Sequence, residues 1–235
     1  MKSRPSRPHS ACASGTDTPN FVFIPALSQP DFDGNDDPAY NMLNDIEDDD
    51  ALVRWYPLRI RHSSAKRAFG VRDELVGKGF ATYLRLEDRE IHEDGERLFK
   101  TRPVITNLIF VKARKKIIRL LKHENSACLS LQFMAKAKRD ASQKTEIIHI
   151  SDKDMTNFID TETRPDPYRQ RIPLTYRDFL DKPGHRVRII RGAFLGIEGE
   201  VKRIMGHRIV VVQLRDVKTA LGITHVSPAD LEFID

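Results

Sequence analysis

The sequence is poor in the features that hold small secreted proteins together or insert proteins into membranes. It has only two cysteines in 235 residues, Cys12 and Cys128, far apart in the chain. Two such thiols make no disulfide framework and suit a reducing compartment. No run of about 18 apolar residues is present, so no membrane-spanning helix is predicted. No apolar stretch long enough for a signal peptide follows the basic first residues, so we expect a cytoplasmic protein.

Motifs for catalysis and metal binding are also lacking. The glycines are not followed by the Lys-Ser or Lys-Thr pair of a phosphate-binding loop. His92 and His123 each precede a glutamate but have no partner at metal-ligand spacing. Cys128 lies in an apolar run, where a buried, inert thiol is expected. We therefore expect no enzyme, no metal and no cofactor.

Charge is distributed unevenly along the chain. Residues 1–50 hold 3 Lys or Arg and 10 Asp or Glu, a net charge of −7. The rest of the chain holds 36 basic and 24 acidic residues, a net charge of +12. A basic body of this kind is typical of proteins that lie against DNA or RNA, although a basic surface without such a partner is the alternative.

The first 50 residues are rich in Ser, Pro, Asp and Asn and show no sustained apolar period. This composition predicts a disordered, acidic N-terminal arm. Two apolar islands interrupt it, at residues 21–24 and 40–46. They are either short docking segments or incidental apolar residues in a tail.

Residues 51–162 alternate between strand-like and helix-like apolar patterns, which predicts an α+β domain. Pro57 lies inside the first strand-like run, so an edge position or a bulge is expected there. Ser63 or Ser64 can cap the first helix, and Ser151 can cap the last one. We expect one sheet with helices on one face. The expected elements are strands at 52–60, 80–86, 104–111 and 129–133, helices at 63–76, 115–122 and after Ser151, and a loop or hairpin tip at 87–101.

A proline-rich segment separates this domain from the C-terminal residues. The prolines of residues 163–177 interrupt regular ladders, so we expect a linker. Residues 178–235 carry short apolar runs separated by glycine-bearing turns, which predicts a small all-β barrel of the SH3-like type. Its expected strands are 186–191, 200–204, 208–214, 223–226 and 231–234.

One stretch of the predicted barrel, GHRVRIIRGAFLGIEGEV at residues 184–201, places a single phenylalanine among glycines. We expect Gly192, Gly196 and Gly199 to permit positive φ in a turn and close packing at the next strand. The Phe194 ring then has two possible roles. It either fills the end of the barrel or waits at the surface for a partner.

The same stretch resembles the KOW motif, in which a strand, Gly-x-Phe, a further glycine and a second strand follow one another. The preceding residues resemble the NGN domain of the NusG family of transcription elongation factors. Trp55-Tyr56 opens the first strand as in that family, and RPVITNLIFV at residues 102–111 resembles the family's Pro-Leu-Phe-Pro-x-Tyr-x-Phe-Val strand. The resemblance extends over residues 52–235 and is closest in detail to specialised paralogs of Bacteroidota, the UpxY type.

This resemblance implies a binding protein. NGN domains of the family bind the clamp helices of RNA polymerase through an apolar pocket and suppress pausing or termination, and specialised members act on particular operons. By position, Ile105 and Leu108 match the pocket phenylalanine and tyrosine, and Phe110 matches the second aromatic residue of that strand. With Trp55 and Tyr56, these residues form the expected polymerase-binding set.

Ile105 and Leu108 are three residues apart, so strict strand alternation puts them on opposite faces. The family uses both matched positions at one pocket, which requires a bend between them. Thr106-Asn107 is the expected place for that bend.

The resemblance implies a second partner for the C-terminal domain. The phenylalanine matched by Phe194 contacts either the termination factor Rho or a small-subunit ribosomal protein, and Ile197 matches a second partner-facing position. We expect the protein to act as a monomer. A ribosome-binding or RNA-binding KOW protein is the alternative function, and an enzyme built on an NGN-like domain is a third.

Basic residues gather around the predicted start of the first helix. NGN domains of the family touch non-template DNA near that helix, so this group is the candidate nucleic-acid surface. A solvated basic face is the alternative, and base-specific readout does not follow from the pattern. The candidate residues are Arg59, Arg61, His62, Lys66 and Arg67.

Overall fold

The computed structural model of the chain describes most of its residues after position 51. They are residues 52–93, 96–121, 127–137, 145–168, 170–174, 184–204 and 206–234. The predicted acidic arm and its two apolar islands lie outside them. No helix in the described ranges is long and apolar enough to cross a bilayer.

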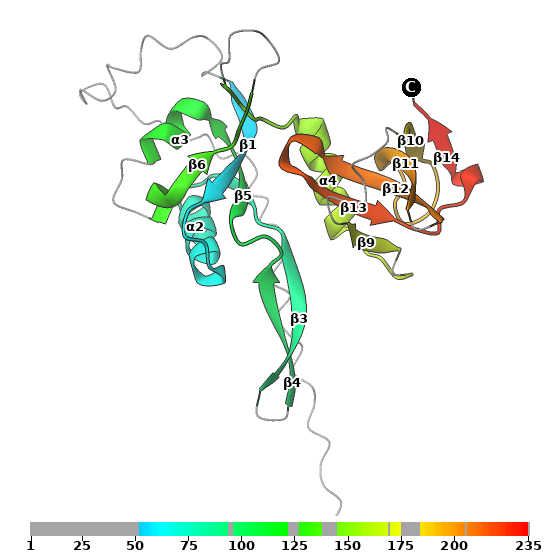
Figure 1. The fold of residues 1–235 in the computed structure, drawn as a ribbon, viewed down its shortest axis with the longest axis horizontal. Coiled ribbons are helices and arrows are strands. Elements are labelled where there is room, and N and C mark those ends of the chain that lie inside the picture. The colour runs from blue at the N-terminus through cyan, green and yellow to red at the C-terminus, as the bar shows by residue number, and fades with distance from the viewer. Residues whose placement is uncertain are drawn as a thin grey trace, which may run out of the picture.

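The N-terminal half of the described chain is built on a four-stranded sheet with the order β2-β5-β1-β6 (Figure 1). The long central pair is antiparallel, with β1 (Val53–Ile60) beside β5 (Leu108–Arg114). Two short strands flank this pair, β2 (Ala81–Tyr83) next to β5 and β6 (Leu131–Phe133) next to β1. The alternating apolar residues of β1 and β5 supply a buried side chain to each face of the sheet.

Helices cover both faces of this sheet, so the prediction of helices on one face is wrong. α2 (Ala65–Gly77) and α3 (Lys115–Leu121) pack on one face, in a cluster with Tyr56, Leu58 and Ile60. α4 (Asp152–Thr163) covers the other face. The periodicity of a helix shows that it has an apolar side but not which sheet face receives it.

The helix starts follow from local capping. The Ser64 side chain accepts a hydrogen bond from the Arg67 backbone N–H at 3.2 Å and caps α2. Ser151 accepts from the Asp154 backbone N–H at 3.0 Å and caps α4, with Asp152 and Asp154 in the first turn. These are the caps that the sequence predicts, because a serine oxygen replaces the missing acceptor of an exposed N–H group.

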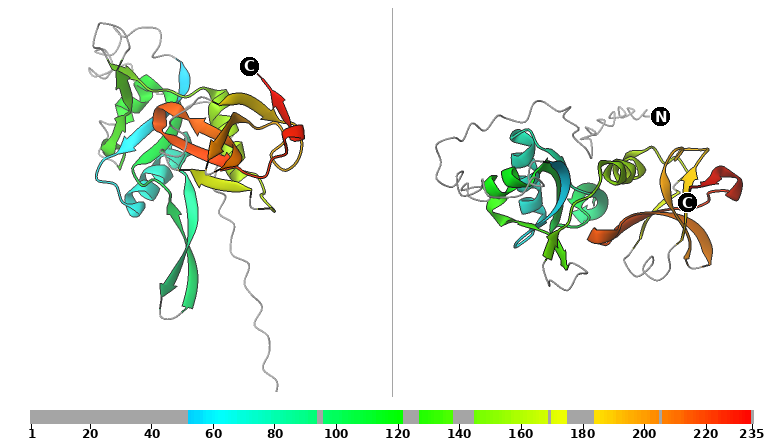
Figure 2. Two further views of the ribbon diagram at one scale, coloured as in Figure 1. Left: turned by 45° about the vertical axis from the view of Figure 1, so that its right-hand side comes forward. Right: turned by 90° about the horizontal axis from the view of Figure 1, so that it is seen from above.

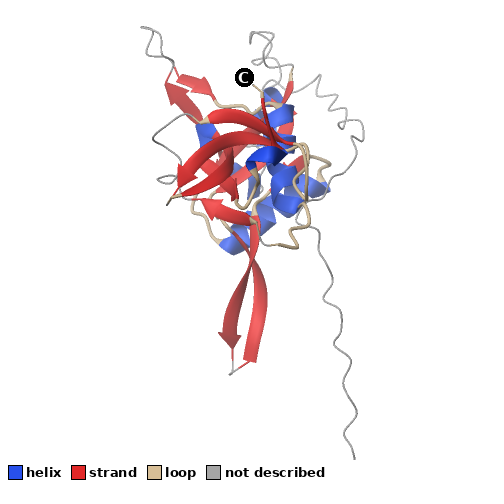
Figure 3. Cartoon of the chain, turned by 90° about the vertical axis from the view of Figure 1, so that its right-hand side faces the viewer, coloured by secondary structure: helices blue, strands red, loops and turns tan. Residues whose placement is uncertain are grey.

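A two-stranded ribbon projects away from the sheet where the sequence predicts a loop or hairpin tip. β3 (Leu86–Glu93) pairs with β4 (Glu96–Pro103) along its whole length, and Figure 3 shows the pair standing clear of the rest of the chain. A second, shorter ribbon pairs β7 (Ala135–Ala137) with β8 (Thr145–Ile147). A short 3₁₀ helix, η2 (Ala127–Ser130), precedes β6.

The C-terminal residues form a six-stranded antiparallel sheet with the order β14-β10-β11-β12-β13-β9. Its strands are β9 (Arg171–Leu174), β10 (His185–Ile189), β11 (Glu198–Ile204), β12 (His207–Leu214), β13 (Thr219–Ile223) and β14 (Leu231–Phe233), with 3₁₀ helices η3 (Arg215–Val217) and η4 (Pro228–Asp230). β14 and β9 are the edges of this sheet, and Figure 2 shows that its strands are curved. Buried apolar side chains of β10, β12 and β13 share one cluster.

Two strands differ from the prediction for this region. Residues 171–174, assigned to the linker, form β9 and pair with β13. Pro173 is accommodated because β9 is an edge strand, where a missing backbone donor is tolerated. The expected strand at 223–226 is wrong. β13 ends at Ile223, and the chain then turns through His225, whose φ is 58°.

α4 lies between the two sheets, as Figure 2 shows from above. Met155, Phe158 and Ile159 belong to one buried cluster that contains residues of β1, β5, β10 and β12. Asn157 fixes the helix to β11 with two hydrogen bonds. Its amide donates to the Glu198 carbonyl at 2.7 Å, and its side-chain oxygen accepts from the Glu198 N–H at 2.9 Å. The two sheets therefore share an apolar core through this helix.

A partly buried carboxyl group completes the junction. The Glu162 side chain on α4 accepts hydrogen bonds from the Tyr83 hydroxyl and from Arg85 Nε, the latter at 2.7 Å. Arg171 on β9 donates to the Thr161 and Arg164 carbonyls at 3.0 and 3.1 Å. Burial raises the pKa of Glu162 from 4.5 to about 8, and the Arg171 charge opposes this rise. Burial also lowers the pKa of Arg85, while Glu87 raises it.

We expect the folded state to weaken with rising pH because of Glu162. A carboxyl group whose pKa is raised on folding stabilises the protein fully below its unfolded pKa, and this contribution is lost as the pH rises through about 8. Between the two pKa values, the free energy of unfolding should fall by about 1 kcal/mol per pH unit. Glu162→Gln, which cannot ionise, should remove this dependence. Urea unfolding of both proteins from pH 6 to 9, followed by Trp55 fluorescence, measures it, and parallel pH profiles would contradict the assignment.

Candidate nucleic-acid interface

The predicted basic surface forms where β1 ends and α2 begins. The chain leaves β1 at Ile60, whose N–H donates to the Asn107 carbonyl at 3.0 Å, and the Arg61 N–H donates to the Ser130 carbonyl at 2.9 Å. His62 then turns with φ 49°, in the left-handed region. Backbone contacts from two other segments therefore fix the short loop that carries Arg61 and His62.

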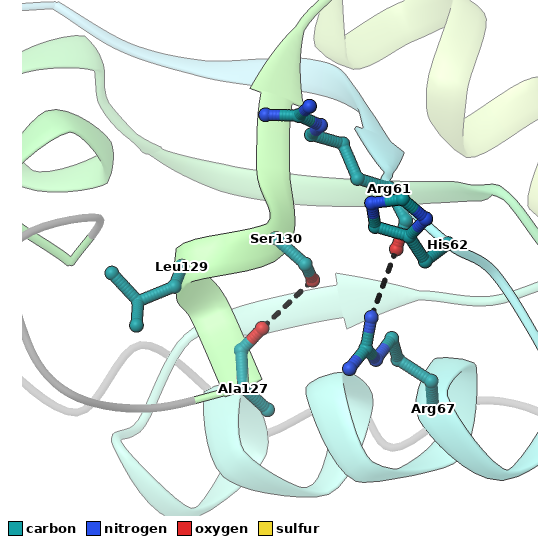
Figure 4. Close-up of a pocket in the computed structure, with 6 residues that line it drawn as sticks. All are labelled: Arg61, His62, Arg67, Ala127, Leu129 and Ser130. Carbon is teal, nitrogen blue, oxygen red and sulfur yellow. Dashed lines mark hydrogen bonds between the residues drawn. The ribbon is translucent and has the colours of Figure 1, made fainter.

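The first turn of α2 supplies the other two cations. Lys66 and Arg67 follow the Ser64 cap and are exposed. Arg67 Nη1 donates to the Arg61 carbonyl at 3.3 Å, so its side chain reaches back across the helix start to the loop. Figure 4 shows Arg67 rising from α2 toward Arg61, with His62 beside them. The positive end of the α2 dipole adds to the local charge.

These side chains border two adjoining open hollows. One has a volume of about 350 Å³ and is lined by Arg61, His62, Arg67, Ala127, Leu129 and Ser130. The other has a volume of about 560 Å³ and is lined by His62, Ser64, Lys66, Arg67, Gly70 and Ala127. We call the surface made by Arg61, His62, Lys66 and Arg67 the cationic hollow. Among the described residues lining it there is no Asp or Glu.

The wall opposite α2 comes from η2, which is not among the predicted site residues. The Ala127 N–H donates to Glu74 of α2 at 2.9 Å, and the Ser130 hydroxyl donates to the Ala127 carbonyl at 2.8 Å. Leu129 is 49 % exposed beside the cations. No local signal in the sequence places this segment against α2, because the contact joins residues far apart in the chain.

Arg59 does not join the other four candidate residues. Leu58 and Ile60 point into the cluster under α2, so Arg59 between them points to the opposite face of the sheet. It lies beside Leu108 and Gln132 in the strand register. Including Arg59 in the cluster was wrong, and strand alternation alone was enough to separate it.

The expected polymerase-binding residues lie mostly in the core. Trp55, Leu108 and Phe110 belong to the cluster under α4, and they are 5, 8 and 2 % exposed. Tyr56 is buried on the opposite face, with its ring centroid 5.6 Å from that of Phe133. Ile105 alone of the five is partly exposed. An open apolar pocket made by all five is therefore not present, because α4 packs against most of them.

Ile105 and Leu108 nevertheless share a face. β5 begins only at Leu108 and continues to Arg114, and residues 104–107 bend and turn ahead of it, so the predicted strand at 104–111 starts and ends too early. The Leu108 N–H approaches the Ile105 carbonyl at 3.4 Å across Thr106 and Asn107. Both side chains pack in the cluster under α4. The expected bend at Thr106-Asn107 is thus confirmed.

Phe194 is a core residue in this structure, and the expectation of an exposed docking ring is wrong. Phe194 and Ile197 are 2 and 1 % exposed and belong to the cluster that α4 covers. Two hydrogen bonds hold the loop of these residues against α4. The Asn157 side chain donates to the Glu198 carbonyl, and the Arg164 side chain donates to the Leu195 carbonyl. The exposed apolar side chains of this region are Leu195 at 56 % and Ile190 at 39 %.

The glycines of this loop have distinct geometric roles. Gly192 and Gly196 have φ angles of 86° and 85°, which residues with a side chain rarely adopt. Gly199 has no positive φ but lies against β12, where a Cβ would be 2.8 Å from both Val210 Cγ1 and the Val211 oxygen. Together they let the loop fold Phe194 inward and let β11 approach β12.

Few of the described residues could bind a metal ion or take part in redox chemistry. They contain no group of three or more His, Cys, Asp or Glu side chains placed to hold a metal ion. Cys128 is fully buried on η2 beneath α2 and α3. The chemistry available at the cationic hollow is the binding of anions.

Comparison with known proteins finds likeness at the level of structure and none at the level of sequence. No protein-family model matches the chain, and no curated protein matches it. A solved structure described as domain interaction in Thermotoga maritima NusG is similar, with 14 % identity and a TM-score of 0.35. The match covers 79 % of this chain and 99 % of that one. An identity and a TM-score of this size support no inference about function. Any proposed function must therefore rest on the residues of this chain.

Proposed function

We propose that the protein is a transcription elongation and antitermination factor of the NusG type that contacts nucleic acid through the cationic hollow. The observation that carries this proposal is the convergence of Arg61, His62, Lys66 and Arg67 around open hollows with no acidic residue in their described lining. Guanidinium and ammonium groups neutralise phosphates, and the release of counterions favours binding. The net charge of +12 beyond residue 50 supports a polyanionic partner.

The polymerase contact is assigned to the edge of the sheet face under α4. Ile105 is the partly exposed member of the expected set and lies in the turn before β5. A side chain in that position is accessible to a partner while its base packs against the core. Trp55, Leu108 and Phe110 then support the shape of this edge from inside. RNA polymerase is the proposed partner, on the basis of the resemblance of residues 52–162 to NGN domains.

The C-terminal sheet is assigned to a second protein partner, as the KOW resemblance implies. With Phe194 and Ile197 buried, the accessible apolar residues for that partner are Leu195 and Ile190 beside the loop, and Phe233 on β14. Rho and a small-subunit ribosomal protein are the two partners that the resemblance offers. In this proposal the protein is a cytoplasmic monomer without catalytic activity or cofactor, and it acts on particular operons, as specialised members of the family do.

We expect the double substitution Arg61→Gln/Arg67→Gln to weaken binding to duplex or single-stranded DNA at least tenfold at about 50 mM salt. Each lost phosphate contact should also reduce the slope of log K against log salt by about 0.9 for duplex DNA. Fluorescence anisotropy with labelled oligonucleotides of several sequences measures both quantities. Binding should fall uniformly across sequences, because phosphate contacts carry no base information.

The matched control is Arg97→Gln/Arg102→Gln, which removes the same charge from β4 on the projecting ribbon. Circular dichroism should show all three proteins folded. Equal weakening by the two double variants would indicate a general charge effect and contradict a site at the cationic hollow. Tight binding to RNA alone, with none to DNA, would favour the alternative function of a ribosome-binding or RNA-binding KOW protein.

A further inference from the structure

The most acidic part of the chain directly precedes the described residues. Residues 31–50 contain nine Asp or Glu and no Lys or Arg, which is almost one negative charge for every two residues. That density makes the segment a polyanion in its own right. A surface with clustered cations on the same chain is complementary to it in charge.

The fold attaches this segment within reach of the cationic hollow. β1 begins at Val53 and ends at Ile60, and Arg61 follows directly. Eight strand residues span only about 26 Å. The 20 residues of the acidic segment can extend to about 66 Å. The tether therefore permits contact, and intramolecular attachment gives an effective concentration that reaches the millimolar range for short flexible linkers.

The hollow also has the chemistry to receive carboxylates. Arg61, His62, Lys66 and Arg67 are exposed, and no described acidic side chain shares the lining with them. Arginine binds carboxylate and phosphate with the same planar set of donors. A surface that accepts phosphates therefore accepts a run such as Asp48-Asp49-Asp50 as well, and the two ligands exclude each other.

We propose that residues 31–50 dock on the cationic hollow as an internal polyanion and compete there with nucleic acid. This inference rests on the nucleic-acid binding proposed above. By occupying the hollow, the arm lowers the affinity of the protein for nucleic acid. Screening weakens the contact as salt rises, since the Debye length is about 10 Å at 0.1 M.

The test uses the full chain with five substitutions in the arm: Asp45→Asn, Glu47→Gln, Asp48→Asn, Asp49→Asn and Asp50→Asn. We expect this neutralised arm to tighten DNA binding at least fivefold at about 50 mM salt and by less than twofold at about 300 mM. A control chain exchanges Asp for Glu and Glu for Asp at the same five positions, which keeps the charge. Its affinity should equal that of the unmodified protein.

A double-mutant cycle locates the contact. If the arm occupies the hollow, neutralising it in the Arg61→Gln/Arg67→Gln background should change affinity less than twofold. Persistent tightening in that background would place the arm elsewhere and overturn the proposal. Unchanged affinity on neutralisation, with Arg61→Gln/Arg67→Gln still weakening DNA binding, would also overturn it and leave the nucleic-acid site intact. Full binding by Arg61→Gln/Arg67→Gln would instead refute the site itself.

Discussion

Phe194→Ala is expected to lower the free energy of unfolding by about 3–5 kcal/mol, the usual cost of removing a buried aromatic ring. The ring is 2 % exposed and shares its cluster with Met155 and Phe158 of α4. The substitution leaves a cavity at the junction of the two sheets, so both should lose stability together. Urea unfolding followed by circular dichroism and by Trp55 fluorescence measures the loss in each.

Leu195→Ala is the matched control for that experiment. Leu195 follows Phe194 in the same loop but is 56 % exposed, so its truncation should change stability by less than about 0.5 kcal/mol. Equal stability of the two variants would show that the Phe194 ring is not part of the core. The Leu195 variant is then the appropriate protein for testing the second partner, because it removes accessible apolar surface from a folded chain.

Leu108→Asp is expected to unfold the N-terminal sheet. Leu108 is 8 % exposed beneath α4, and an aspartate there loses its hydration without gaining a partner. Burying an unpaired carboxylate costs several kcal/mol, which is comparable with the whole stability of a domain. Circular dichroism and thermal unfolding of the purified variant measure the effect.

Ile105→Asp is the contrasting substitution on the same face. Its side chain is partly exposed in the turn before β5, so the charge can remain in water and the protein should stay folded. A folded Leu108→Asp protein with an unchanged melting temperature would contradict the burial of β5 under α4. Ile105→Asp, in contrast to Leu108→Asp, allows polymerase binding to be measured apart from folding.

Local signals in the sequence predicted much of the N-terminal fold. Ser64 and Ser151 cap α2 and α4 because a cap depends on a few adjacent residues. The strand β1 was predicted from its alternating apolar residues. Pro57 was expected at an edge or a bulge, but β1 is an interior strand between β5 and β6, and the Met134 N–H donates to the Pro57 carbonyl at 3.4 Å.

Features that depend on distant contacts were not predictable in the same way. The β3–β4 ribbon is mostly polar, so residues 87–101 carried no apolar period by which to recognise its strands. β9 lies in a proline-rich segment and becomes a strand only because β13 offers an edge. α4 reaches Phe194 from more than 30 residues earlier in the chain. No pattern around the glycine loop indicates that a helix covers it.

The candidate site was predictable to a similar extent. The grouping of Arg61, His62, Lys66 and Arg67 followed from their positions beside one helix start. Arg59 was included on proximity in sequence alone, although alternation along β1 directs it to the other sheet face. The η2 wall of the hollow depends on a contact between Glu74 and Ala127, which no local pattern reveals.

The most direct test of the proposed function is the recovery of RNA polymerase with the full-length protein after nuclease treatment. Tagged unmodified protein and Ile105→Asp are each immobilised and incubated with a lysate of the native host, and retained polymerase subunits are quantified by mass spectrometry. We expect polymerase to survive nuclease treatment with the unmodified protein and to fall at least tenfold with Ile105→Asp, a change of about 1.4 kcal/mol. Retention of ribosomal proteins without polymerase, or equal polymerase on both proteins, would contradict a NusG-type contact at this edge of the sheet.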